Sequence, residues 1–257
     1  MIHTFGYREL LTKEVVEAWR TYRLAILCGI FVVIGIVVPL LVRFLPRLLR
    51  WFGATGELGL EDLGVADVVE VLVRNVTLIG GIAAILLTMG SIAGERRRGT
   101  LRLVLSRPVS RAAVIWAKFV ALGMAFGLAT GLAVLAAWLY SALFFSPQAA
   151  LPWGQLGAVL WLSLMVHVAV TLFGSVVAAT PLGAGMFGLA FVAVMSLASN
   201  VTSLARLLPV GLGEVARAVA LEDVSPDLLP GATVGVSLAV IAVALGAAWW
   251  RFRRMDV

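Results

Sequence analysis

Long apolar runs, separated by short polar segments, make up most of this chain. A helix that crosses the ~30 Å hydrocarbon core of a bilayer needs about 20 mainly apolar residues. The runs that meet this requirement predict an all-α integral membrane fold with six transmembrane helices. The predicted spans cover residues 24–42, 76–94, 112–140, 156–179, 182–201 and 231–250.

Residues 7–23 have a different pattern, in which apolar and charged positions recur with a helical period. This pattern predicts an amphipathic helix that lies along the membrane surface before the first span. Its candidate contact residues are Glu14, Trp19 and Arg20. The sequence leaves open whether this helix only anchors the chain in membrane lipid or also contacts a partner.

The composition agrees with a membrane protein and excludes two other classes of chain. Apolar residues make up 61% of the 257 positions and charged residues 13%, whereas soluble domains are about 45–50% apolar and about 25% charged. A soluble domain and a disordered chain are both excluded. Because the polar segments are short, we expect one transmembrane domain over residues 1–257.

Positive charge gathers on one predicted side of the membrane. The segments on the side of the N-terminus hold 14 of the 20 Lys and Arg residues but only 5 of the 14 acidic residues. The positive-inside rule therefore places both termini in the cytoplasm. The net charge of +6 then reflects topology, and we expect no nucleic-acid partner.

The cytoplasmic segment 95–111 combines this positive charge with a short apolar patch. Its three consecutive arginines cannot be buried in the bilayer, since each would cost roughly 2.5–3.5 kcal/mol at the centre. Thr100 and Pro108 are expected to start and stop a short helix over about 100–106, and Ser110 to cap the third span. An exposed apolar patch rimmed by charge is typical of a docking surface. A basic loop bound to anionic lipid headgroups explains the pattern equally well.

The residues of this region resemble the signature of ABC-2-type transporter permeases. The matching residues are Glu95, Gly99, Thr100, Leu105, Ser106, Pro108, Val109, Ser110, Arg111 and Lys118. Ala117 stands where the family commonly has glycine. The resemblance extends over essentially the whole chain and is closest to the NosY-like branch of half-size permeases, with a type V exporter-like fold.

The resemblance implies a non-catalytic membrane subunit of the bacterial cytoplasmic membrane. A homodimer of this subunit would pair with two separate ATPase subunits in a 2:2 complex and drive export, and an extracytoplasmic partner is a further expectation. ATP and Mg²⁺ would bind to the ATPase, and this chain would bind no cofactor. The sequence agrees, because it has no G-x-x-x-x-G-K-[ST] phosphate-binding loop.

Within that division of labour, segment 95–111 would be the loop that couples the permease to the ATPase. The residues to which the resemblance gives this role are Glu95, Gly99, Thr100, Leu101, Leu105, Arg107 and Arg111. The connection over residues 202–230 would form re-entrant external helices.

His167 is the candidate for chemistry within the spans, because an ionisable residue inside a membrane is functional by default. No second His or Cys lies within helical reach, so we expect no metal site. Ser175 is eight residues away, about 12 Å along a helix, which argues against a protease dyad. A hydrogen-bonded or cavity-facing position is expected for His167.

Two other functions use the same features. A membrane scaffold or assembly factor would need the docking segment but would transport nothing. An intramembrane enzyme would need several convergent polar groups, and the predicted spans supply few.

Overall fold

The computed structural model describes residues 5–51, 63–100, 110–223 and 229–255, and all regular secondary structure in these ranges is helical. The helices are, in order, α1 (Phe5–Arg20), α2 (Arg23–Trp51), α3 (Val65–Met89), α4 (Ala93–Arg97), α6 (Arg111–Phe144), α7 (Ala150–Val177), α8 (Pro181–Ala198), α9 (Thr202–Ala205), the 3-10 helix η2 (Pro209–Gly211), α10 (Leu212–Ala220) and α11 (Pro230–Arg253).

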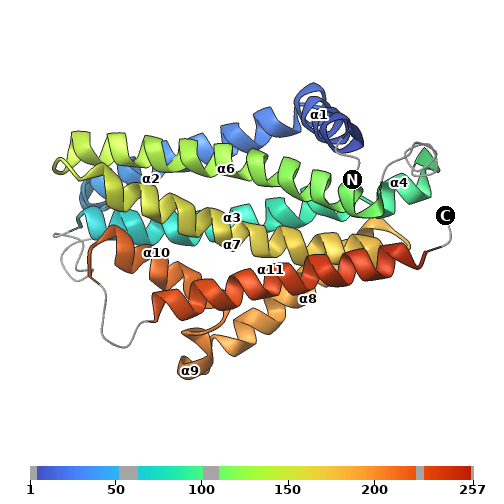
Figure 1. Cartoon of the computed structure of the whole chain (residues 1–257). Helices are drawn as coiled ribbons and strands as arrows, with labels where there is room; N and C mark the ends of the chain where they lie inside the picture. The colour runs from blue at the N-terminus through green and yellow to red at the C-terminus, as the bar shows by residue number, and fades with distance from the viewer. Residues whose placement is uncertain (1–4, 52–62, 101–109, 224–228, 256–257) are drawn as a thin grey trace.

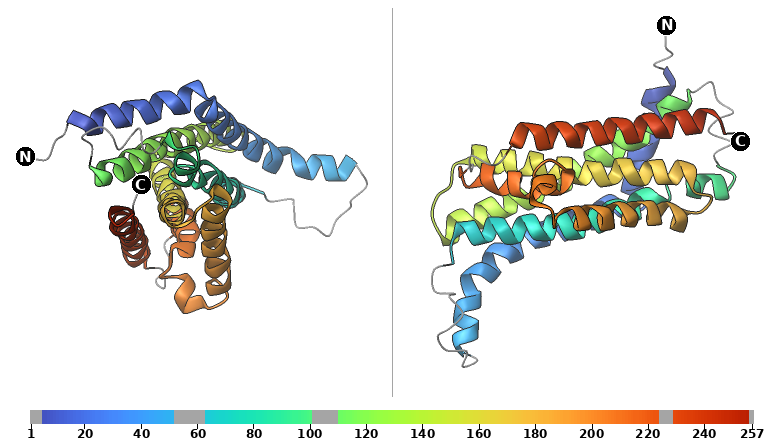
Figure 2. Two further views of the ribbon diagram at one scale, coloured as in Figure 1. Left: turned by 90° about the vertical axis from the view of Figure 1, so that its right-hand side faces the viewer. Right: turned by 90° about the horizontal axis from the view of Figure 1, so that it is seen from below.

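Six of the described helices, α2, α3, α6, α7, α8 and α11, are long and apolar enough to cross a membrane. They run along a common direction, and α1 lies across one end of the bundle (Figures 1 and 2). Both ends of the described chain lie near that same end, together with α4, and we call it the inner end and the opposite one the outer end (Figure 1). The predicted all-α fold with six spans is confirmed.

The helix bounds differ from the predicted spans at the outer ends of the first two. Helix α2 continues to Trp51, and its last part turns away from the bundle in both views of Figure 2. Pro39 and Pro46 lie inside α2, and proline is the usual cause of a bend in a helix. Helix α3 begins at Val65, because charged residues such as Glu70 extend a helix into water although they end an apolar run.

The inner ends of two helices also differ from the predicted bounds. Helix α1 ends at Arg20 rather than at residue 23, because Tyr22 has a φ of 58°, which is incompatible with a right-handed helix. The second span stops at Met89, and the chain turns before α4 begins at Ala93. This interruption positions the side chains described in the next section.

Helix α7 lies at the centre of the packing and contacts α3, α6, α8, α10 and α11. Leu160, Leu164 and Leu172 on α7 are fully buried. A second contact joins α2 to α6, where the Phe31 and Phe126 rings meet edge to face with centroids 6.5 Å apart. Helix α10 buries one face against α7 and α3, so the outer connection is part of the packed fold.

Candidate functional site

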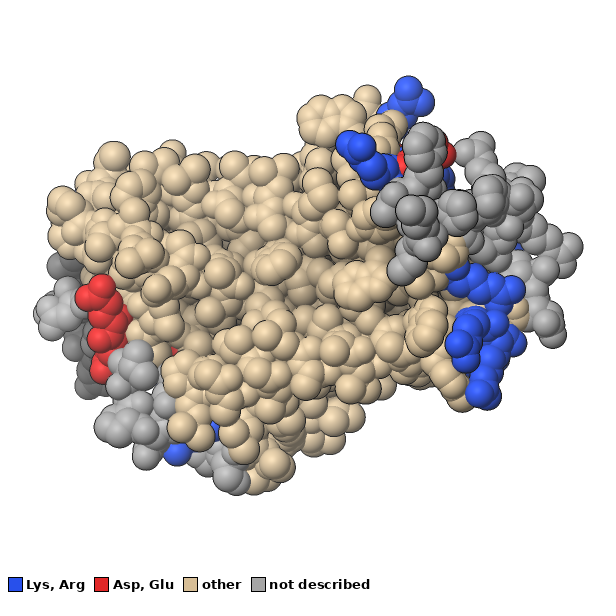
Figure 3. All heavy atoms as spheres, in the orientation of Figure 1, with Lys and Arg blue, Asp and Glu red and all other residues tan. Residues whose placement is uncertain are grey.

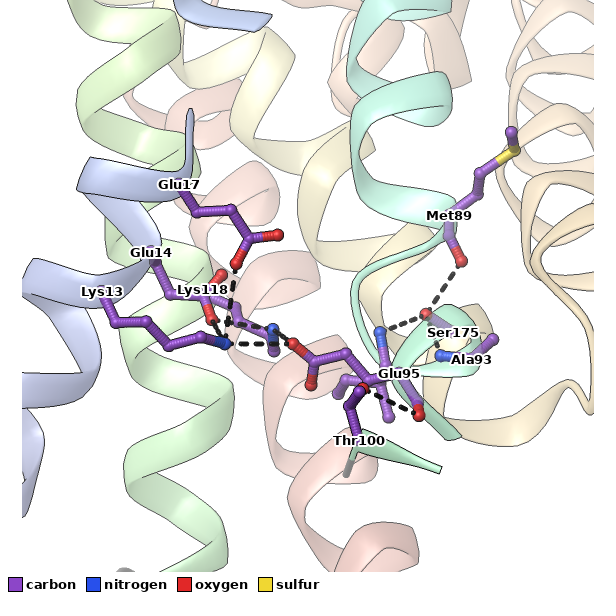
Figure 4. A network of polar contacts seen from close by, with 10 residues as sticks. Lys13, Glu14, Glu17, Met89, Ala93, Glu95, Thr100, Lys118 and Ser175 are labelled. Carbon is purple, nitrogen blue, oxygen red and sulfur yellow. Dashed lines mark hydrogen bonds and ion pairs between the residues drawn. The ribbon is translucent and has the colours of Figure 1, made fainter. Parts of the chain in front are cut away.

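Charged side chains from three helices meet where α1 crosses the inner end of the bundle (Figure 4). Lys118 Nζ on α6 lies 2.7 Å from Glu95 Oε1 on α4 and 3.0 Å from Glu14 Oε1 on α1. Lys13 Nζ lies 3.4 Å from Glu14 Oε1, 3.5 Å from Glu95 Oε1 and 3.6 Å from Glu17 Oε2. We call these five residues the ion network.

The ion network is buried at its centre and exposed at its edge. The Lys118 and Glu95 side chains are 5% and 9% exposed, whereas Lys13 is 45% exposed. Burial alone would lower the pKa of Lys13, but the carboxylates of Glu14, Glu95 and Glu17 outweigh it and raise that pKa above 10.5. Breaking a buried pair leaves an uncompensated charge and costs about 3–5 kcal/mol. The network therefore holds α1, α4 and α6 together.

A single hydroxyl fixes the interruption between α3 and α4. Ser175 Oγ on α7 accepts hydrogen bonds from the backbone N–H groups of Ile92 and Ala93, both at 3.0 Å, and donates to the carbonyl oxygen of Met89 at 3.0 Å (Figure 4). It thereby satisfies backbone groups that the break in the helix leaves without partners. Ser175 is fully buried and sets the position of the turn that carries Glu95.

The chain leaves α4 through a turn that requires glycine. Gly99 has a φ of +72°, in the left-handed region that a side chain disfavours. Thr100 Oγ1 then donates a hydrogen bond to the carbonyl oxygen of Glu95 at 3.2 Å. This short turn connects the first residues of segment 95–111 to the ion network.

The other end of that segment is attached to the C-terminus. Arg111 Nη1 donates hydrogen bonds to the carbonyl oxygens of Phe252, Arg253 and Met255, at 2.8, 2.9 and 2.8 Å. These carbonyls lie at and just beyond the end of α11, where a helix has no partners of its own for them. The Arg111 guanidinium therefore joins the start of α6 to the end of α11.

Arg96 makes a similar connection from α4. Its guanidinium donates to the carbonyl oxygens of Val176, at 3.5 Å, and Ala178, and lies 3.8 Å from Met255 Sδ. The ends of α7 and α11 are thus held beside Arg96 and Arg111, the two arginines near the ends of segment 95–111.

Comparison with known proteins places this architecture in a family. Residues 10–257 match the family model described as ABC-2 family transporter protein. The chain belongs to the ABC-2 transporter family. A transmembrane protein of Bacillus subtilis strain 168, YxlG, which is described as uncharacterized, is 28% identical over 259 residues that cover 96% of this chain and 97% of the relative. The resemblance is confirmed at the level of the family, and the NosY-like branch stays a prediction.

The coupling residues expected for this ABC-2 family chain fall into two groups. Glu95, Gly99, Thr100 and Arg111 lie at the two ends of segment 95–111 and make contacts within the chain. The others, Leu101, Leu105 and Arg107, lie outside the described residues, and so does all of the short helix expected over 100–106 except Thr100. Their role stays a prediction.

The three candidates on α1 and the expected cap also have defined places. Glu14 belongs to the ion network, whereas Trp19 is 70% exposed and Arg20 is exposed. Ser110 caps α6, since its hydroxyl accepts a hydrogen bond from the N–H of Ala113 at 3.1 Å. Sequence reasoning weighed Ser175 only as a partner of His167 and missed its role in the turn between α3 and α4, for which the only signal was a small polar residue near the end of an apolar span.

His167 lies on α7, away from the ion network. Its Nδ1 is 2.8 Å from the carbonyl oxygen of Ser163, and its ring meets Phe191 edge to face at 5.8 Å between centroids. It also lines a cavity of about 430 Å³. The inner end of the molecule can therefore transmit force through fixed contacts, and the middle of the bundle can hold a ligand.

Proposed function

We propose that this chain is the permease subunit of an ABC transporter, which couples ATP hydrolysis by a separate ATPase chain to export or to conformational work across the membrane. Membership of the ABC-2 family supports a permease subunit, and permeases of this family are typically non-catalytic. The single observation that carries coupling is the buried ion network at the start of segment 95–111.

The contacts at both ends of this segment provide a mechanical route. A push on the segment displaces α4 and the start of α6, and the ion network makes α1 follow, because separating Lys118 from its carboxylates is costly. The bonds of Arg111 make the end of α11 follow as well. Movement of packed helices as a rigid body is a common way to transmit a switch.

Orientation and assembly are parts of the same proposal. Lys and Arg side chains cluster at the end of the molecule where the termini lie, and acidic side chains are visible at the opposite end (Figure 3). This asymmetry supports a cytoplasmic location for both termini, in a bacterial cytoplasmic membrane. We propose a homodimer with two ATPase subunits, which bind ATP and Mg²⁺, and an extracytoplasmic partner on the acidic side.

Purification of the full chain from its native membrane in mild detergent tests the proposal. An ATPase subunit should be recovered in about equal amount and should be lost from the double variant Leu101→Arg, Leu105→Arg. The matched control is Leu143→Arg with Leu229→Arg, which adds the same charge at exposed positions of the opposite end. Recovery of the ATPase with both double variants would contradict docking through the segment. A bound partner without ATP-dependent transport in vesicles would favour the scaffold function.

A further inference from the structure

A cavity of about 430 Å³ opens among α3, α7, α8 and the η2–α10 connection, which pack against one another (Figure 1). Its volume is within the range of small-molecule sites, which is about 300–1,000 Å³. The walls are mainly apolar side chains of α3 and α8, such as Leu78, Ile82, Leu189 and Val192. Polar groups enter this apolar space at only a few points, and these points define what the cavity can bind.

Arg74 is the charged residue that lines the cavity. It lies on the outer part of α3 and makes no ion pair with any of the described residues. Arg74 is exposed, so its guanidinium is free to pair with an anion that enters the cavity. Arg74 therefore favours a ligand with an acidic headgroup.

His167 presents a different polar group deeper in the cavity. The Ser163 carbonyl oxygen can only accept a hydrogen bond, so a neutral His167 carries its proton on Nδ1 and has a lone pair on Nε2. Gly81 places no side-chain atoms beside Nε2, and a Cβ added at that position would lie 3.6 Å from this atom, in van der Waals contact with it. His167 can thus accept a hydrogen bond from a hydroxyl or an amide N–H of a ligand.

The spacing of these groups sets the dimensions of the ligand. Arg74 and Gly81 are two turns apart on the same face of α3, about 10 Å along the axis. Thr77 lies between them, lines the cavity, and has a buried hydroxyl without a hydrogen-bond partner among the described residues. The polar groups therefore follow one wall from the outer interface toward the middle of the bilayer.

We propose that this cavity binds an anionic amphiphile, whose acidic headgroup contacts Arg74 and whose apolar chain carries a hydroxyl or amide N–H that donates to His167 Nε2. The inference rests on the proposed function, since it names the class of molecule that the permease would carry. It needs only one copy of the chain, because a single protomer supplies all the residues named here.

Binding can be measured with the purified full chain in nanodiscs of phosphatidylcholine. The probes are dodecyl phosphate, 8-hydroxydodecyl phosphate and dodecyltrimethylammonium, which differ in charge or in one hydroxyl. Both phosphates should bind, the hydroxylated one several-fold more tightly, and the cation should bind at least tenfold more weakly than either. Equal affinity for the cation and the phosphates would overturn the proposal.

Three variants assign the contacts. Arg74→Gln should weaken both phosphates about tenfold or more, whereas His167→Phe should remove only the advantage of the hydroxyl. Gly81→Leu should abolish binding of all probes by filling the cavity without removing a polar group. The control Arg217→Gln removes an outer arginine that pairs with Glu214 outside the cavity, and it should leave every affinity unchanged.

Thermal unfolding midpoints show whether each variant is folded, so that lost binding is not mistaken for lost structure. Unchanged phosphate affinity in folded Arg74→Gln protein would overturn the proposal. The outcome is separable from the proposed function. Recovery of an ATPase without phosphate binding would refute the amphiphile site alone, and phosphate binding without an ATPase would refute the permease function alone.

Discussion

The ion network at the inner end and the cavity around His167 use polar residues in opposite ways. In the network, charges from α1, α4 and α6 pair with one another, and Lys118 contacts two carboxylates at once, although Glu95 Oε2 has no hydrogen-bond partner among the described residues. In the cavity, Arg74 has no ion-pair partner within the described residues, and His167 uses one ring nitrogen on its own helix. Partnered charges make a joint that moves as a unit, whereas polar groups without partners make a surface that selects a ligand.

The largest effect should come from removing the cation at the centre of the network. Lys118→Met leaves the buried Glu95 and the half-buried Glu14 with only their longer contacts to Lys13, and we expect a loss of stability of up to about 3–5 kcal/mol. Lys13→Met, at the exposed edge, should cost less than about 1 kcal/mol. Thermal unfolding in detergent measures both changes, and similar losses for the two variants would show that the network is no tighter at its centre.

The next largest effect tests whether the ion network depends on the break between α3 and α4. Ser175→Ala leaves buried backbone groups of Met89, Ile92 and Ala93 without their partner and should cost about 1–3 kcal/mol. Ser237→Ala is the control, because this buried hydroxyl only donates to the Thr233 carbonyl within its own helix. Hydrogen exchange at the amides of Ile92 and Ala93 should accelerate in the first variant alone, and unchanged exchange would contradict the role of Ser175.

The pattern of apolar residues predicts much of the fold but little of the ion network. The six spans and the cap at Ser110 follow from local sequence. A run of about twenty apolar residues is enough to predict a span, and a serine just before a helix is enough to predict a cap. The ion pair between Glu14 and Lys118 joins residues 104 positions apart, so no local pattern can indicate it. Arg111 likewise has an ordinary place in a basic loop, and only the fold brings the end of α11 to it.

Removal of the hydrogen bonds between Arg111 and the end of α11 should have a smaller effect than either of these changes. Arg111→Gln removes the bonds to the carbonyls of Phe252, Arg253 and Met255, and it should destabilise the end of α11 by about 1–2 kcal/mol. Limited proteolysis and hydrogen exchange of the C-terminal residues measure this loosening. Arg251→Gln removes an exposed arginine of the same helix and should leave the C-terminal residues protected. Equal exposure in the two variants would show that Arg111 does not hold α11.

The smallest effect distinguishes the edge of the network from its centre by pH. The carboxylates of Glu14, Glu95 and Glu17 outweigh burial and raise the pKa of Lys13, so its contribution is fully present below about 10.5 and is lost as the pH rises through the folded value. Because Lys13 is 45% exposed and screened by water, this contribution should be only about 0.2–1 kcal/mol. The difference in unfolding midpoint between wild type and Lys13→Met should therefore be constant from pH 8 to about 10.5 and shrink above it. A difference that shrinks already near pH 8 would mean that the carboxylates do not hold the proton on Lys13, and the edge of the network would then behave as an ordinary solvated surface.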